Sequence, residues 1–335
     1  MIDNIVMIKN NLSETEIKRV VNQSRLLEKS VNGLTVYHNG SNKNFEGGFY
    51  IKISENRTLK ITGSLHKYHT FLNHNKLNNF DSFTMQQAKE TMYKLATNKG
   101  FDTENTKVTF YEIGLNLIVD FEPSEILKNV KSIGSIENEK EFFYNAKYKK
   151  KTHKNTETHR DFRIYHKMYD KVFEMQDKRK QPPNEMKIVR IETAHRRVEN
   201  TFLKDFLKDE NLNQLQKKFF GYWHKINFFN DIDAPKGTHK SKIELAKEIM
   251  HKGKKEVFEN YFNQYKNLVL SAKMYYSIKK FINNWEQDKH IYKVKKTDIF
   301  TNWQKVYNTE YQIYSNNKSN ELICIDKNFV SNGTI

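Results

Sequence analysis

The spacing of apolar residues divides the chain into two parts. Up to about residue 198, apolar and polar positions alternate over short segments, as at Leu59, Ile61 and Leu65, which is typical of strands with one buried face. From about residue 200 the apolar residues recur every three or four positions, as in amphipathic helices. The pattern predicts an α+β fold, in which a domain at 1–198 has a central, mainly antiparallel sheet with flanking helices and is followed by an α-helical region at 199–335.

Cap and turn signals set the expected limits of the elements. Ser13 with Glu16 three residues later predicts a helix that runs to about residue 29, and residues 81–84 begin another that ends before Gly100. The expected strands are 2–8, 34–38, 45–54, 57–65, 108–120, 141–148, 161–173 and 187–195. The expected later helices lie near 123–131, 202–220, 240–251, 254–284 and 297–308.

Three strand segments combine features of a nuclease site. Two carry a single carboxylate among apolar residues, at Glu112 and Glu192, and the third places Tyr165 two residues before Lys167. Successive side chains of a strand alternate between its faces, so Tyr165, Lys167 and Tyr169 should share one face. Carboxylates that hold a divalent metal, a tyrosine nucleophile and an adjacent cation are the groups needed to cut a phosphodiester and keep the cut end. The segments are 110–116, 159–167 and 188–192.

Glu112 and Glu192 are the candidate metal ligands. An acid inside an apolar strand must be paired, metal-bound or solvated at a sheet face, so either one alone could be an ordinary polar-face residue opposite a lysine. Two such acids on neighbouring strands favour a site for Mg²⁺ or Mn²⁺, which take oxygen ligands. His66, His69 and His74 follow a strand, and His74 is the candidate imidazole ligand, with an ordinary polar loop residue as the alternative.

Tyr165 is the preferred nucleophile. A phenol with a pKa near ~10 needs a nearby cation or a metal-polarised phosphate to react near neutral pH. Lys167 and Lys171 are expected on the same strand face, where they could stabilise phenolate or phosphate charge. Tyr169 has the same spacing to Lys171, so the choice between the two tyrosines stays open. Packing is the alternative role for both, because the chain has 18 tyrosines.

The chain is strongly basic, with 57 Lys and Arg against 40 Asp and Glu and a formal net charge of +17. Such an excess attracts polyanions, of which nucleic acid is the usual one. A genome that favours lysine and asparagine codons is the alternative explanation. A membrane surface is a weaker alternative, because no basic helix shows a clean apolar face. The residues expected to contact DNA are Lys149, Lys150, Lys151, Arg160, Arg163 and Arg190. The helical region 199–335, in which lysines and aromatic residues occur together, is expected to help hold duplex or origin hairpin DNA, with amphipathic helices that have a lysine-rich solvent face as the alternative.

Other features limit the class of protein. The single cysteine, Cys324, cannot form an internal disulfide and excludes zinc sites built from cysteines. No stretch approaches the ~18 apolar residues of a membrane span. The early acid Asp3, with no basic region followed by an apolar run, argues against a signal peptide. We therefore expect a cytoplasmic protein that makes no membrane contact.

The order of these segments resembles that of the filamentous-phage replication initiators, the nicking–closing proteins of rolling-circle replication. The shared features are the opening residues 1–6, a His-Asn pair at 74–75, the acidic strand at 111–113, the His-Arg segment that leads to Tyr-x-Lys at 159–167, and Val-Arg-apolar-Glu at 189–192. The related plasmid initiators also have a Tyr-Asp-Lys strand like residues 169–171. The resemblance covers roughly residues 1–210.

This resemblance implies a metal-dependent endonuclease, using Mg²⁺ or Mn²⁺, that nicks one strand at a replication origin. By position, Tyr165 matches the nucleophile that joins the 5′-phosphate, leaves a 3′-hydroxyl for the host polymerase and later permits rejoining. Glu112 and Glu192 match the acidic strands, although Glu112 stands where an aspartate is expected. The implied partners are single-stranded and duplex origin DNA, with the host polymerase, a helicase and a second copy of the chain as further candidates in the bacterial cytoplasm.

Three other functions fit the same residues. A relaxase or transposase of another mobile element would use the same tyrosine chemistry, and the lack of a Walker-type Gly-x4-Gly-Lys pattern excludes only helicase-fused forms. A non-catalytic origin-DNA or RNA-binding protein would show no metal-dependent cleavage and would still bind when Glu112 and Glu192 become alanine. A hydrolytic nuclease would use water as the nucleophile and leave no bond between protein and DNA.

Overall fold

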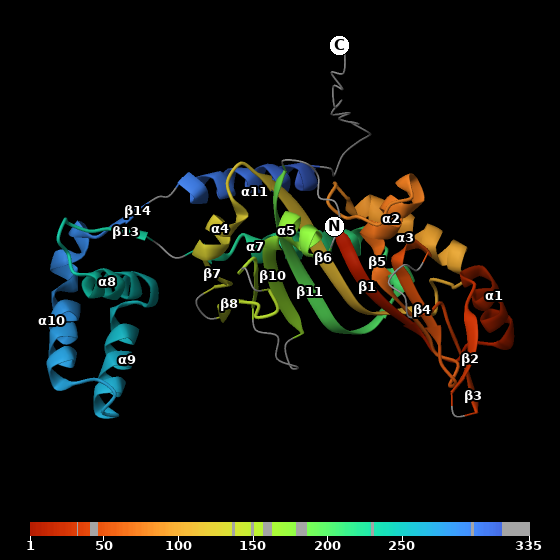
Figure 1. Ribbon diagram of the computed structural model, residues 1–335, viewed down its shortest axis with the longest axis horizontal. Coiled ribbons are helices and arrows are strands. Elements are labelled where there is room, and N and C mark those ends of the chain that lie inside the picture. Colours follow the sequence, from red (N-terminus) through yellow and green to blue (C-terminus); the bar gives the residue numbers. More distant parts are fainter. Residues whose placement is uncertain are drawn as a thin grey trace, which may run out of the picture.

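A computed structural model describes residues 1–31, 33–40, 46–135, 138–148, 151–156, 163–178, 186–228, 231–295 and 298–316 of the 335-residue chain. Its main body is built on a twelve-stranded sheet, in the order β12-β7-β8-β9-β10-β11-β6-β1-β5-β4-β3-β2. Every neighbouring pair in this sheet is antiparallel, which confirms the predicted α+β class (Figure 1). The strands are β1 (Ile2–Lys9), β2 (Leu27–Val31), β3 (Leu34–His38), β4 (Phe49–Ile53), β5 (Leu59–Ser64), β6 (Lys107–Val119), β7 (Val130–Ile133), β8 (Lys140–Tyr144), β9 (His153–Thr156), β10 (Ile164–Asp170), β11 (Lys187–Phe202) and β12 (Ile226–Phe228).

Helices pack on the central strands and complete the main body. Apolar side chains of β6 and β11, such as Ile113 and Ile191, share one hydrophobic core with Phe219 and Trp223. The last helix, α11, lies against β6 and α4, so the end of the described chain returns to the sheet (Figure 1). The helices of the main body are α1 (Glu14–Ser24), α2 (Leu65–His74), α3 (Met85–Lys99), α4 (Pro123–Asn129), α5 (Lys171–Asp177), α6 (Leu203–Phe206), α7 (Asp209–Trp223) and α11 (Asp298–Asn316).

A second lobe, residues 231–295, has a hydrophobic core of its own. Leu245, Val257 and Trp285 are among its buried residues. Figure 1 shows this lobe set apart from the sheet, at the left of the view. It consists of β13 (Asp231–Asp233), α8 (Lys240–Lys252), α9 (Lys254–Lys266), α10 (Ala272–Asp288), a 3₁₀ turn at Lys289–Ile291 and β14 (Lys293–Lys295), which pairs with β13.

The two cores divide the chain differently from the expected boundary at residue 198. Trp223 of α7 and Trp303 and Tyr307 of α11 belong to the core of the main body. In addition, β12 extends the large sheet by pairing with β7. The region expected as one helical unit is therefore divided. Its elements α7, β12 and α11 belong to the main body, and residues 231–295 form the second lobe.

The cap signals of the sequence are confirmed at both predicted helices. Ser13 accepts a hydrogen bond from the backbone of Glu16, whose side chain bonds back to Ser13, and Thr84 caps α3 in the same way. Gly100 ends α3 with a φ of 76°. The first helix is shorter than predicted, because Arg25 takes a left-handed conformation after Ser24 and β2 follows.

Two helices replace segments that were expected to be strand or loop. Ser64 caps α2 by accepting a hydrogen bond of 3.2 Å from the backbone of Lys67, so the histidine segment is helical. The strand expected to run to residue 173 ends at Asp170, because the Asp170 side chain accepts a 2.9 Å hydrogen bond from the backbone of Phe173. Lys171 therefore begins a helix.

Candidate functional site

The three predicted site segments lie on the adjacent strands β6, β11 and β10. Lys167 is opposite Glu192 in the register, Glu192 is opposite Gly114, and Glu112 is opposite Ala194. Residues two apart on a strand share a face. Glu112, Lys167 and Glu192 therefore project from one side of the sheet, named the site face below.

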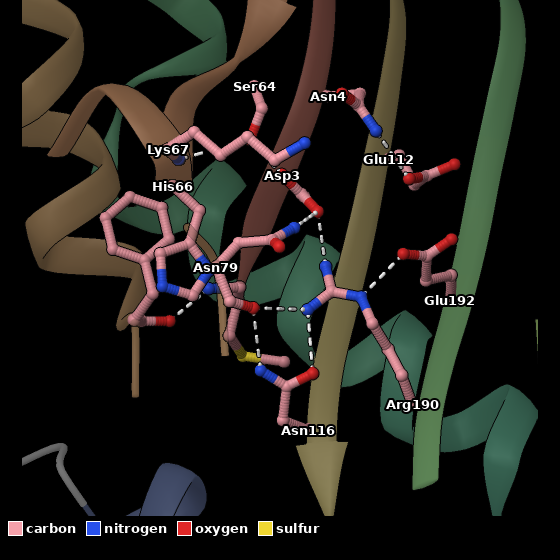
Figure 2. Close-up of polar contacts among 12 residues, drawn as sticks. Asp3, Asn4, Ser64, His66, Lys67, Asn79, Glu112, Asn116, Arg190 and Glu192 are labelled. Atoms are coloured by element: carbon pink, nitrogen blue, oxygen red, sulfur yellow. Dashed lines mark hydrogen bonds and ion pairs between the residues drawn. The ribbon is translucent and has the colours of Figure 1, made fainter. Parts of the chain in front are cut away.

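Lys167 joins the two predicted acids. Its Nζ lies 2.5 Å from Glu112 Oε2 and 2.6 Å from Glu192 Oε2. Asn4 of β1 donates a 2.8 Å hydrogen bond to the other Glu112 oxygen (Figure 2). Glu112 and Glu192 are only 2% and 3% exposed, so their charges depend on such partners rather than on water.

A second cation, Arg190, connects the site face to the start of β1. Its Nε donates a 2.6 Å hydrogen bond to Glu192, its Nη2 pairs with Asp3, and its Nη1 donates a 2.8 Å bond to Asn116. Asn79 donates a further 2.8 Å bond to Asp3. Figure 2 shows the guanidinium group between Asp3 and Glu192, with its donors directed at both. Through these contacts Arg190 links the start of β1 to β6 and β11.

Gly114 leaves the space that Arg190 fills. A Cβ atom at this position would lie 2.6 Å from Arg190 Nη2 and 3.3 Å from Glu192 Cγ. Contacts as short as the first essentially never occur, so any larger residue would force the guanidinium away from its partners. The glycine within the predicted segment 110–116 is therefore part of the site.

The structure gives the two candidate tyrosines different environments. Tyr169 is buried and its hydroxyl donates a 2.7 Å hydrogen bond to Glu192. Burial raises the pKa of Tyr169 well above its ordinary value. Tyr165 is half-buried, with the Arg196 guanidinium 4.4 Å and the Lys167 ammonium 5.8 Å from its ring centroid. Of the two, Tyr165 is the one that a substrate can reach.

The buried charges of the site shift one another's pKa values. Burial and the neighbouring Glu192 raise the pKa of Glu112 to about 7. Burial opposes the charge of Glu192 as well, but Lys167 and Arg190 outweigh it and hold the pKa of Glu192 well below its ordinary value. With Asp3 included, three carboxylates face two cations. Negative charge therefore exceeds positive charge by one among these five groups, and either a proton or a bound cation would balance it.

Three carboxylates lie close enough to share a metal ion. Asp3, Glu112 and Glu192, named the carboxylate cluster below, each offer an oxygen, and these oxygens lie within 4.8 Å of one another. An all-oxygen donor set suits a hard divalent cation. An ion bound between the two glutamates would have to displace the Lys167 ammonium, which pairs with both. The chemistry of the donors fits a metal, with Lys167 as its competitor.

His74, the third expected ligand, lies outside the carboxylate cluster. It is exposed in the last turn of α2. The buried histidine of the same helix, His66, places its Nε2 2.7 Å from Asp81 and stacks on Phe83. Among the residues that the structure describes, the acids and histidines placed to share a metal ion are the three carboxylates of the cluster. The expectation of an imidazole ligand is therefore not supported.

Lys171 does not share the strand face with Lys167, so that prediction is wrong. It starts α5, where its Nζ donates hydrogen bonds of 2.8 Å to Asn79 and 2.9 Å to Glu174. Burial lowers the pKa of Lys171 to about 8. Asn79 also donates a hydrogen bond to Asp3, so Lys171 is linked to the carboxylate cluster through Asn79.

The residues expected to contact DNA fall into different settings. Arg190 is 1% exposed and is paired with Asp3 and Glu192, which contradicts a DNA-binding role. Arg163 is exposed and forms a 3.0 Å ion pair with Glu199. Lys151 lies over the ring of Tyr144, with its Nζ 5.7 Å from the ring centroid. Lys149, Lys150 and Arg160 lie outside the described part of the chain, as does the single cysteine, Cys324.

Two residues of the site were missed in the sequence, although each has a signal. Asp3 is an acid inside the apolar segment 2–8, which is the same pattern that identified Glu112. Arg196 follows Glu192 by four residues, so the alternation of a strand places it on the site face. Asp3 lies within the strand expected at 2–8, whereas Arg196 lies just beyond the strand expected at 187–195, because β11 continues to Phe202.

The opposite face of these strands packs against α7 through a buried histidine. His166 Nδ1 lies 3.0 Å from the Thr193 hydroxyl, to which Trp223 Nε1 also donates a 3.0 Å hydrogen bond. Burial, helped by the nearby charges of Lys140 and His195, lowers the pKa of His166 to about 3. His166 is therefore neutral in the folded protein across the physiological range.

We expect His166 to make the fold sensitive to acid. An unfolded histidine has a pKa near ~6.5, so its contribution to the free energy of unfolding is complete above that pH and is lost as pH falls toward about 3. Near pH 5 the loss is about 2 kcal/mol. Between roughly pH 7 and pH 5, the free energy of unfolding measured in urea should therefore fall by about 2 kcal/mol less for His166→Gln than for wild type. Equal losses would contradict a buried, neutral His166.

Neither the protein-family models nor the curated proteins give a match. Within the described residues, no helix combines the length and apolar character needed to cross a membrane. Any functional conclusion therefore depends on the chemistry of the site face and on the charge of the chain.

Proposed function

We propose that the chain is a rolling-circle replication initiator, a metal-dependent single-strand DNA endonuclease and strand-joining enzyme that forms a 5′-phosphotyrosine link at an origin. One observation carries this proposal: the accessible Tyr165 stands on the same sheet face as Lys167, which is paired with two buried glutamates. A nucleophile supplied by the chain itself favours strand transfer over hydrolysis.

Tyr165 supplies the attacking oxygen. Its hydroxyl gives up a proton and forms a bond to the scissile phosphorus, while the bond to the 3′-oxygen breaks and that oxygen takes a proton. The link conserves the energy of the phosphodiester, so the reverse attack by a 3′-hydroxyl rejoins a strand without ATP. Arg196 and Lys167, both near the Tyr165 ring, offset the negative charge that develops on the phosphate and the phenol.

The carboxylate cluster is the proposed Mg²⁺ or Mn²⁺ site. Asp3, Glu112 and Glu192 would hold the ion, which when bound would polarise the scissile phosphate. The Arg190 side chain keeps Asp3 and Glu192 in place from the buried side. Displaced from the glutamates, Lys167 would remain beside Tyr165, because both lie on one face of β10.

Metal affinity provides a direct test of this ligand set. In calorimetric titrations with Mn²⁺, Asp3→Asn and Glu192→Gln should each weaken binding by about tenfold or more. Lys167→Met should strengthen it, because the competing ammonium is removed. His74→Asn is the control and should leave the affinity unchanged. If Lys167→Met does not raise the affinity while His74→Asn lowers it, the ion binds elsewhere.

The proposed substrates are single-stranded and duplex origin DNA. The net charge of +17 favours such a partner, and exposed basic groups such as Arg163 lie near the start of β10. A 3′-hydroxyl left by nicking would serve the host polymerase, with a helicase opening the duplex ahead of it. The proposed setting is the bacterial cytoplasm, where a second copy of the chain could take part in closing the circle.

The experiment for this function is transfer of labelled DNA onto the protein. Labelled single strands that tile the DNA around the gene are incubated with Mn²⁺ or Mg²⁺ and separated on a denaturing protein gel. A metal-dependent shift of the label to the protein is expected. Cleavage without transfer would indicate a hydrolytic nuclease, and tight binding without cleavage would indicate a non-catalytic DNA-binding protein. A relaxase or transposase would also form the adduct, but with DNA from a transfer origin or an element end.

A further inference from the structure

The connection between α9 and α10 exposes large apolar side chains to solvent. Leu268 is 91% and Val269 is 75% exposed, the highest values among the large hydrophobic residues that the structure describes. Met274 and Tyr276, at the start of α10, are 57% and 59% exposed. The residues 267–271, named the hairpin tip, thus carry apolar side chains into solvent. Figure 1 shows this tip at the far end of the second lobe.

The hairpin tip is a well-ordered turn rather than a loose loop. Leu268 N donates to the Tyr265 carbonyl at 3.1 Å, and Val269 N donates to the Gln264 carbonyl at 2.9 Å. Ser271 then caps α10 by accepting from the backbone of Met274. The backbone groups that end one helix and begin the next are therefore satisfied, and the backbone that carries the apolar side chains has a defined conformation.

The fold alone does not explain why leucine occupies position 268. Leu268 has a φ of 58°, in the left-handed region, where a non-glycine residue costs about 1 kcal/mol. Asparagine or glycine would suit this conformation better. A strained leucine that is 91% exposed contributes little to the hydrophobic core. Its presence indicates a surface that is covered by something else.

Charge indicates what covers the tip. The segment 260–285 contains four lysines and no aspartate or glutamate. Lys266 and Lys273 flank the tip on α9 and α10, and both are exposed. Lys279 and Lys280 follow two turns further along α10. An apolar wedge with lysines on either side fits a polyanion that has apolar layers inside it, which describes the stacked bases of DNA between phosphates.

We propose that the hairpin tip is a DNA wedge, in which Leu268 and Val269 insert between base pairs of a duplex while the flanking lysines bind phosphates. The insertion unstacks the duplex that the enzyme engages. Proteins that bend or open DNA use apolar side chains in this way, and the lysine contacts offset the cost of unstacking. The use of the wedge to expose a strand for nicking rests on the proposed function, whereas DNA insertion itself does not.

A protein or a lipid surface fits the tip less well. Peripheral helices that bind membranes spread their apolar residues along one face of a helix. The exposed apolar residues here gather at the end of a helical hairpin, and the sides of α9 and α10 use their apolar residues, such as Val257 and Ile282, in the lobe core. A narrow, basic and apolar tip matches the width of a DNA groove better than a broad interface.

The test uses the full chain and a short duplex that carries 2-aminopurine, whose fluorescence rises when its neighbours unstack. Wild type should bind the duplex and raise the fluorescence. The double variant Leu268→Asn with Val269→Ser should bind about tenfold more weakly and lose the rise. Leu27→Ser, which changes a leucine of β2 that is 64% exposed, is the matched control. In urea unfolding, Leu27→Ser should be nearly unchanged and the double variant should be no less stable than wild type, because the replaced side chains are exposed and asparagine suits the left-handed conformation of residue 268.

Three results would overturn the proposal. The double variant could bind and unstack DNA as wild type does, it could lose binding only to vesicles of anionic lipid, or it could lose only self-association measured by light scattering. Adduct formation with single-stranded DNA separates this inference from the nicking function. If wild type unstacks the duplex but forms no adduct, the wedge stands and the nicking function fails. If the double variant forms the adduct but wild type does not unstack the duplex, the nicking function stands and the wedge fails.

Discussion

Replacing Tyr165 with phenylalanine should abolish the metal-dependent attachment of DNA to the protein. The change removes the only atom of the side chain that can attack a phosphate and keeps the ring, over which Arg196 lies at 4.4 Å. We expect a decrease of about a thousandfold or more in adduct formation, with DNA binding and the free energy of unfolding nearly unchanged. The measurement is the rate of label transfer to the protein in Mn²⁺.

Tyr169→Phe is the matched control for this experiment. Tyr169 lies four residues away on the same strand face, but its hydroxyl is buried and donates to Glu192 at 2.7 Å. Loss of that hydrogen bond should lower the free energy of unfolding by about 1–3 kcal/mol. Adduct formation should continue in this variant. If Tyr169→Phe abolishes the adduct and Tyr165→Phe does not, the assignment of the nucleophile is reversed.

Arg190→Met should destabilise the fold by about 3–5 kcal/mol, because it leaves Asp3 buried without its paired cation and leaves Glu192 with Lys167 alone. Methionine keeps much of the apolar volume of the side chain, so the loss reports mainly on charge. The urea unfolding free energy, measured without divalent ions, is the quantity to compare. The same variant should bind Mn²⁺ poorly, because two ligands of the carboxylate cluster lose their anchor.

Arg163→Met is the matched control for Arg190→Met. Both arginines pair with carboxylates, but the Arg163 side chain is 63% exposed and its partner Glu199 is 66% exposed. Water screens such a pair, so Arg163→Met should change the unfolding free energy by less than about 1 kcal/mol. Its expected effect is on DNA affinity instead. Equal losses of stability in the two variants would contradict the buried ion network around Arg190.

The sequence was sufficient to bring the central residues of the site together. Alternation placed Glu112, Lys167 and Glu192 on strands, and neighbouring strands were expected because two lone acids and a Tyr-x-Lys segment together supply the groups of one nuclease site. The structure confirms that β6, β11 and β10 are adjacent and that the three side chains share a face. The antiparallel class followed from the same pattern. These inferences succeeded because they depend on a period of two, which the local sequence carries.

The remainder of the site depends on contacts that a local pattern does not contain. Arg190 alternates with apolar neighbours like a surface residue, and its burial follows from Asp3, which lies 187 residues away in the chain. Lys171 continues the alternation of β10, but the side chain of Asp170 caps a helix and turns the chain there. His74 was expected near the acids because its segment follows a strand, but that segment forms the helix α2, which ends with this residue in solvent.

The division into cores was also beyond the local pattern. α7 and α11 have the same amphipathic spacing as α8 and α10, yet Trp223 and Trp303 pack on the large sheet, whereas Trp285 packs in the second lobe. Amphipathic spacing identifies which side of a helix is buried but not its partner. The boundary expected at residue 198 followed the change from strand to helix, and the chain instead divides between the two hydrophobic cores.

The most direct test of the central claim is to locate the nucleotide on the protein by mass spectrometry. The adduct formed with single-stranded DNA is digested with nuclease and then with trypsin. Trypsin cuts after Arg163, Lys167 and Lys171, so Tyr165 and Tyr169 fall in separate peptides, 164–167 and 168–171. The account predicts a nucleotide mass on the peptide 164–167. A nucleotide on 168–171 or on any other peptide, or cleaved DNA with no modified peptide, would contradict it.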